Sequence, residues 1–92
     1  GGSNAGKDML MGQMKATNTW ARYQAKVQRE VLYAQERENL EAELAVRSDA
    51  LPADVRARKE QRLAFIKGKL AEYEKEKADI SAEAKAQEAD RD

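Results

Sequence analysis

The chain has 92 residues, and its 17 basic and 17 acidic side chains give a net charge of zero at pH 7. A chain of this length forms at most one small domain, and only 14 residues are Leu, Ile, Val or Phe, which argues against a thick globular core. Histidine and cysteine are both missing, which removes the commonest metal ligand and any disulfide, so we expect no cofactor and no metal. More than half of the residues are Ala, Glu, Lys, Leu or Arg, a composition typical of long helices and coiled coils.

Residues 1–6 open the chain with Gly-Gly-Ser-Asn-Ala-Gly. This pattern is typical of the remnant that cleavage of an expression tag leaves behind, so we expect a disordered start and exclude it from the fold. The longest fully apolar run covers residues 9–11, too short to span a bilayer or to act as a signal peptide. We therefore expect residues 7–92 to form a single soluble helical hairpin.

A single turn signal divides the rest of the chain almost in half. Pro52, the only proline, follows the sequence Ser-Asp-Ala-Leu at residues 48–51. Proline suits the first turn of a helix and Asp54 suits its positive end, while Arg47 suits the negative end of a preceding helix. The predicted elements are a helix over residues 8–47, a turn over 48–52 and a helix over 53–88.

Apolar residues recur in both halves at alternating spacings of three and four, the pattern of a coiled-coil seam. Because the connection is short, the two helices should be antiparallel neighbours. A hairpin that closes near residue 50 places Trp20 opposite Ile80 and Val31 opposite Leu70. The predicted hairpin core consists of Trp20, Tyr23, Val27, Val31, Ala34, Leu63, Ile66, Leu70, Tyr73 and Ile80.

Other apolar side chains have no place in a two-helix contact. Arg37 and Glu41 lie on the predicted seam instead. A dimer of hairpins that forms a four-helix bundle would cover the outward residues, so we expect a homo-oligomer. Gly68 lies on the outer face of the second helix, either as a tolerated surface glycine or at a close helix contact in that assembly. The predicted oligomer interface consists of Leu32, Tyr33, Leu40, Leu44 and Phe65.

Carboxylates are abundant, but abundance alone does not define a catalytic site. An acid/base pair needs an enclosed pocket that separates the pKa values of its two members, and a thin hairpin exposes its side chains to bulk water. We therefore expect no enzyme activity. The pairs Glu43 with Arg47 and Asp54 with Arg58 are better interpreted as i,i+4 support of the helices.

The densest basic cluster follows the turn and consists of Arg56, Arg58, Lys59 and Arg62. Phosphate binding needs an uncompensated basic face, whereas Asp54 and Glu60 interrupt this one and the chain is neutral overall. We therefore do not expect a nucleic-acid protein. Electrostatic binding of anionic lipid or nucleic acid through this cluster is kept as the alternative function.

The stretch "TNTWARYQAKVQREVLY" resembles a bacterial family of membrane proteins known as domain of unknown function 4337. The family typically shows a Trp-x-Tyr-Tyr-Gln-Ala-Lys core, which Trp20, Tyr23, Gln24, Ala25 and Lys26 match, while Arg22 stands where the first tyrosine is usual. The stretches "LPADVRAR" and "LAEYEKEKADI" extend the resemblance into the second half. The resemblance covers about residues 12–87. The family has no assigned activity.

The resemblance implies a protein of the bacterial inner membrane in which transmembrane helices precede and follow this hairpin. The flanking segments would then tether a segment that lies outside the bilayer, in the periplasm by family topology, with the cytoplasmic side left open. On this interpretation the domain is a structural or interaction module. Its partners would be a second copy of itself or an unidentified membrane or periplasmic protein.

Overall fold

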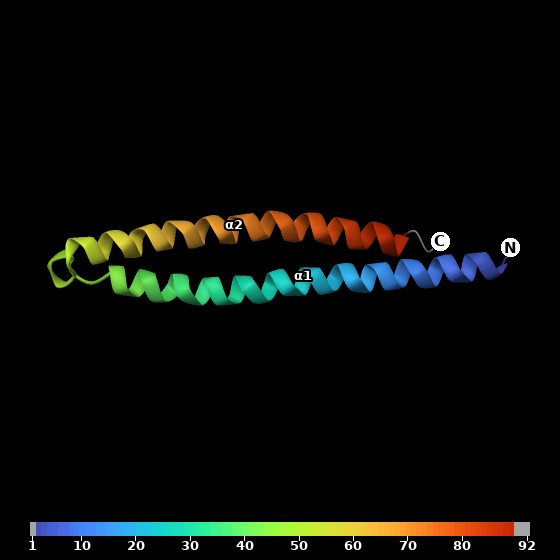
Figure 1. The fold of residues 1–92 in the computed structure, drawn as a ribbon, viewed down its shortest axis with the longest axis horizontal. Helices are drawn as coiled ribbons and strands as arrows, with labels where there is room; N and C mark the ends of the chain where they lie inside the picture. Colours follow the sequence, from blue (N-terminus) through green and yellow to red (C-terminus); the bar gives the residue numbers. More distant parts are fainter. Residues whose placement is uncertain (1, 90–92) are drawn as a thin grey trace. The chain divides into compact units, whose positions relative to one another are not determined.

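A computed structural model describes residues 2–89, with the side chains of residues 2, 3 and 48 left out. Over this range the fold is all-α and is an antiparallel helical hairpin, as the sequence predicts (Figure 1). Helix α1 (Gly2–Leu44) leads through a short 3₁₀ helix, η1 (Ser48–Ala50), into helix α2 (Ala53–Ala89). Helix α1 therefore begins six residues before the predicted boundary near residue 8. Neither helix offers, within the described range, a stretch that is long and apolar enough to cross a membrane.

The connection between the helices begins earlier than expected, because α1 ends at Leu44 and not near residue 47. Arg47, predicted at the C-terminus of α1, lies beyond that helix and pairs with Asp49 at 3.0 Å on the exposed surface. Pro52 directly precedes α2 and accepts a hydrogen bond from the backbone N–H of Arg56 at 3.0 Å. Asp54 lies in the first turn of α2, where its charge complements the helix dipole.

The chain divides into two compact units, and each contains a segment of both helices. Unit 1 comprises Gly1–Val27 with Glu74–Asp92, and unit 2 comprises Gln28–Tyr73. In unit 1 the most buried side chains are mainly small: Ala16 is 4% exposed, Thr19 4% and Ala84 0%, beside Ile80 at 6%. Small side chains let two helices approach closely, because the separation of helix axes depends on the residues at the contact.

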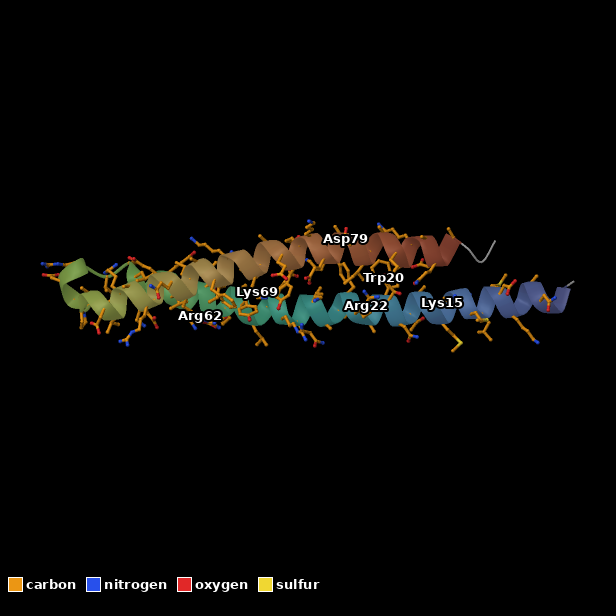
Figure 2. The ribbon with its side chains drawn as sticks, turned by 45° about the horizontal axis from the view of Figure 1, so that its top comes forward. Lys15, Trp20, Arg22, Arg62, Lys69 and Asp79 are labelled. Atoms are coloured by element: carbon orange, nitrogen blue, oxygen red, sulfur yellow. The ribbon has the colours of Figure 1, made fainter. Side chains whose placement is uncertain are left out.

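Polar contacts lie beside the seam of small residues in unit 1. The sequence predicted that Trp20 lies opposite Ile80 in this segment. The indole nitrogen of Trp20 donates to Glu88 Oε1 at 2.5 Å, about two turns beyond Ile80 along α2. Next to it, the Thr19 hydroxyl donates to Gln87 Oε1 at 2.7 Å. In Figure 2 the Trp20 side chain projects from α1 toward α2. The predicted core residues Trp20, Tyr23 and Val27 are half-buried.

Larger apolar side chains form the core of unit 2. Ile66 is 0% exposed and Tyr73 7%, while Leu63, Leu70 and Ala34 are half-buried. Leu40 is also buried, at 9% exposure. The prediction that Leu40 points away from the two-helix contact is therefore wrong.

The seam on α1 follows a different stripe from the predicted one. Glu30, Tyr33 and Arg37 are half-buried and lead to Leu40 at spacings of three, four and three, so polar residues occupy seam positions. The predicted stripe followed apolar character and drifted around the helix to Val31, which is 62% exposed. Placing Val31 in the core is therefore wrong, because the 3.5-residue spacing of a seam overrides the polarity of single positions. Glu41, also predicted on the seam, is exposed.

Candidate interaction surface

Three aromatic rings meet on one side of unit 2. The rings of Tyr33 on α1 and Phe65 on α2 are 6.4 Å apart at an interplanar angle of 69°, an edge-to-face arrangement. Tyr33 also lies 6.0 Å from the ring of Tyr73. Aromatic pairs in this distance range stabilise a contact beyond the area they bury. Tyr33 thus belongs partly to the hairpin contact, although the sequence assigned it to an outer interface.

Two cations from α2 lie over the Tyr33 and Phe65 rings. The Arg62 guanidinium carbon lies 5.1 Å from the Phe65 ring centre and 5.9 Å from that of Tyr33, and Lys69 Nζ lies 5.7 Å from the Phe65 centre. Contacts within about 6 Å of a ring centre are attractive through the ring quadrupole. Arg62 and Lys69 are labelled in Figure 2 on α2.

Arg62 also bridges the two helices through Glu36. Its Nε donates to Glu36 Oε2 at 2.6 Å and its Nη2 donates to Glu36 Oε1 at 3.0 Å, a bidentate arrangement. This hydrogen bonding lowers the pKa of the Glu36 carboxyl from its ordinary value and raises the pKa of Arg62. The pair fixes the Arg62 side chain over the rings.

Large apolar side chains remain open to solvent on this same side. Leu32 is 72% exposed and Phe65 is 47% exposed. A groove of about 480 Å³ is lined by Arg29, Leu32, Tyr33, Glu36 and Tyr73. A second groove, of about 340 Å³, is lined by Ala64, Phe65, Gly68, Lys69 and Glu72. We name this surface the aromatic face and define it by Leu32, Tyr33, Glu36, Arg62, Phe65, Lys69 and Glu72.

The five predicted interface residues therefore fall into two groups, those on the aromatic face and those between or at the end of the helices. Leu32 and Phe65 lie on the aromatic face as exposed side chains, and Tyr33 lies beneath them. Leu40 is buried between the helices and Leu44 is half-buried at the end of α1. The aromatic face thus joins residues from both helices, which a separate stripe for each helix did not reveal.

The four residues of the basic cluster make contacts within unit 2. Arg56 donates from Nη1 to the carbonyl of Leu44 at 3.2 Å and from Nη2 to that of Val46 at 3.0 Å. These carbonyls lie at and just beyond the end of α1, where backbone acceptors have no partner within the helix. Arg56 therefore caps α1 from the opposite helix, a role that the sequence did not suggest.

The other three cations of the cluster are ion-paired. Lys59 Nζ lies 2.6 Å from Glu43 Oε2 on the opposite helix, so Glu43 does not pair with Arg47 as predicted. Arg58 lies 3.6 Å from Asp54, the predicted i,i+4 pair, and Arg62 holds Glu36. The cluster thus joins the helices near the turn and its charge is compensated locally.

Carboxylates on the described part of the chain do not gather into a group of three or more that could hold a metal ion. Several are instead paired with a cation from the facing helix, as in Lys26 with Glu76 at 2.7 Å and Arg22 with Glu83 at 3.3 Å in unit 1. The aromatic face therefore combines apolar and aromatic side chains with charged groups at its border. This arrangement is typical of an interaction surface.

This geometry defines the class of the protein as an antiparallel helical hairpin with an exposed aromatic face. The model of the family described as Domain of unknown function (DUF4337) matches residues 1–92, so the chain belongs to this family. The match confirms the resemblance and also includes residues 1–6, which the sequence predicts to be the remnant of a tag. The comparisons with curated proteins and with solved structures gave no significant match.

Proposed function

We propose that the hairpin is a structural module that self-associates through its aromatic face into a dimer of hairpins, a four-helix bundle. The observation that carries the proposal is the exposure of Leu32 and Phe65 on one side of unit 2. Burial of a large apolar side chain contributes about 1.5–3 kcal/mol. A contact that covers both side chains in each of two copies thus has a driving force that the isolated hairpin leaves unused.

The border of the aromatic face supports the same proposal. Arg62 and Lys69 already lie over the rings, and Glu36 and Glu72 bring acidic groups to the same surface. Mixed charge around an apolar centre is the usual anatomy of a specific protein interface. It also makes the surface compatible with a copy of itself, because each sign of charge has a counterpart on the other copy.

The basic cluster receives no such support as a site for anionic lipid or nucleic acid. Arg56 caps α1, and Lys59 and Arg62 bind carboxylates of the opposite helix. A phosphate would have to displace these contacts before it could use the cations. The proposal therefore rests on apolar contact. We expect the affinity of self-association to change little with salt concentration.

The cellular part of the proposal rests on what the family resemblance implies. We place the hairpin outside the bilayer in the full-length bacterial protein, in the periplasm, tethered to the inner membrane by flanking transmembrane segments. There it would space or scaffold its own copies or an unidentified membrane or periplasmic protein. This segment has no cysteine of its own, so a cysteine introduced at exposed position 31, in a full-length protein whose flanking segments carry no other cysteine, would report the compartment. Labelling of intact cells with an impermeant maleimide is expected, and labelling only after lysis would place the hairpin in the cytoplasm.

Solution mass across a concentration series tests self-association. Sedimentation equilibrium of the wild-type chain is expected to show a dimer, while Leu32→Glu and Phe65→Glu should shift the population toward monomer. Val31→Glu is the matched control, because Val31 is 62% exposed but is not part of the aromatic face. A wild-type monomer at every concentration up to about 1 mM, where half-association would correspond to about −4 kcal/mol, would overturn the proposal.

A further inference from the structure

We infer that the second copy docks on the aromatic face with its α2 antiparallel to α2 of the first copy, around a twofold axis between Phe65 and Lys69. This inference rests on the self-association proposed above and adds the orientation and the pairing of residues. It is carried by the order of charges along one stripe of α2 and by the space beside Phe65.

The stripe consists of Arg62, Phe65, Lys69 and Glu72, at spacings of three, four and three residues. Residues at these spacings lie on one face of a helix. The stripe carries a basic residue at one end and an acidic residue at the other. When two such stripes meet antiparallel, Arg62 lies opposite Glu72 of the second copy and Phe65 lies opposite Lys69, at both ends of the twofold contact.

A parallel pairing of α2 with α2 would have the opposite electrostatic effect. It would set Arg62 against Arg62 and Glu72 against Glu72, and like charges that face each other across an interface are unfavourable. The Lys69 residues would meet as well, instead of each lying near an aromatic ring. The charge order of the stripe therefore selects the antiparallel arrangement.

The side chains at the two ends of the stripe are available for this exchange. Arg62 uses Nε and Nη2 for Glu36, which leaves Nη1 for a carboxylate of the second copy, and its side chain is 46% exposed. The Glu72 side chain is 51% exposed and lies 3.4 Å from Lys69 on its own helix. In the docked pair Glu72 would lie between Lys69 and the incoming Arg62.

Gly68 supplies the space that the Phe65 ring of the second copy needs. A Cβ atom added at Gly68 would meet nothing within 4 Å, and the groove of about 340 Å³ beside it is lined by Ala64, Phe65, Gly68, Lys69 and Glu72. A cavity of about 150 Å³ is enough to hold benzene. A phenylalanine ring from the second copy therefore fits the groove, and Gly68 lies where the two helices approach.

Charge reversal with cross-rescue tests the orientation. Glu72→Arg alone places Arg62 against the new cation at both ends of the contact, and Arg62→Glu alone places two carboxylates together. Each variant is expected to dimerise about tenfold more weakly than the wild type. An equimolar mixture of the two variants should dimerise about as tightly as the wild type, because every facing pair is again of opposite charge. In a parallel pairing each residue faces its own copy, so the single reversals would leave the number of like-charged pairs unchanged and neither variant would dimerise more weakly than the wild type.

Glu60→Arg is the matched control, since it makes the same change of charge at an exposed α2 position off the stripe; it should leave the dimer affinity unchanged. Circular dichroism checks that each variant keeps the helicity of the wild type. If the wild type dimerises but the single variants dimerise equally tightly, or the mixture stays as weak as the separate variants, the antiparallel docking is wrong while self-association stands. If the wild type is a monomer, the proposed function itself fails, and this orientation with it.

Discussion

The indole nitrogen of Trp20 on α1 donates a hydrogen bond to Glu88 Oε1 on α2 at 2.5 Å. The neighbouring bond from Thr19 to Gln87, at 2.7 Å, joins the same two segments. Both lie in unit 1, where the most buried side chains beside Ile80 are the small ones of Ala16, Thr19 and Ala84. The polar bonds of one aromatic and one hydroxyl side chain therefore have an unusual weight in the stability of this unit.

Substitution of Trp20 should loosen unit 1 selectively. Trp20→Phe keeps a ring but loses the bond to the charged Glu88, and we expect a loss of about 1 kcal/mol. Trp20→Ala also loses the apolar surface and should cost about 2 kcal/mol. Residue-resolved hydrogen exchange is expected to show faster exchange in residues 10–27 and 74–88. Equal acceleration in unit 2, or none anywhere, would contradict this.

Removal of the Arg56 cap should open the end of α1. Arg56→Ala leaves the Leu44 and Val46 carbonyls without their charged donor and should destabilise the hairpin by about 1–2 kcal/mol, measured by thermal unfolding. Arg58→Ala removes the same charge but only an exposed i,i+4 pair with Asp54, which contributes about 0.3–0.5 kcal/mol. Equal effects of the two substitutions would mean that Arg56 acts through net charge and not as a cap.

Val31 separates the observed seam from the predicted one, and Ile66 belongs to both and serves as the reference. Ile66 is 0% exposed and Val31 is 62% exposed. Ile66→Ala should cost about 2–5 kcal/mol, as for buried aliphatic residues in general, whereas Val31→Ala should change the free energy of unfolding by less than about 0.5 kcal/mol. Chemical denaturation of both variants decides between the two stripes, and a large loss for Val31→Ala would favour the stripe predicted from the sequence.

The Glu36–Arg62 pair should make the hairpin sensitive to acid. The folded-state pKa of Glu36 lies below its unfolded value because Arg62 hydrogen-bonds the carboxylate. Its contribution is therefore present above the unfolded pKa and is lost as the pH falls through the folded pKa. Melting temperatures measured from pH 7 down to pH 2 should fall less steeply for Glu36→Gln than for the wild type, and identical slopes would exclude this pair as a source of acid sensitivity.

Replacement of Gly68 should separate hairpin stability from docking. Nothing lies within 4 Å of an added Cβ, and alanine is favoured over glycine in a helix interior by about 1 kcal/mol. Gly68→Ala should therefore stabilise the helix by that amount, while Gly68→Leu should keep the fold but weaken the dimer by filling the groove. Thermal unfolding and sedimentation measure the two effects. An unaffected dimer in Gly68→Leu would show that the groove is not part of the contact.

The sequence by itself determined the class of fold. The 3.5-residue spacing in the second half predicted the residues of α2 that face α1. Of these residues, Ile66, Tyr73 and Ile80 are buried and Leu63 is half-buried. Pro52 and Asp54 located the start of α2 to within a residue. These features are local, because periodicity and helix-end preferences depend on the backbone geometry of one helix and need no knowledge of its neighbour.

Only the tertiary structure decided which face of α1 meets α2. The apolar stripe led to Val31, while the structure turns Leu40 and the half-buried Glu30 and Arg37 inward. Polar side chains tolerate a seam position when long aliphatic stems lie along it and their charged ends reach a partner or water. Likewise the Arg56 cap and the aromatic face exist only once α2 lies against α1, because their members are distant in sequence and become neighbours through folding.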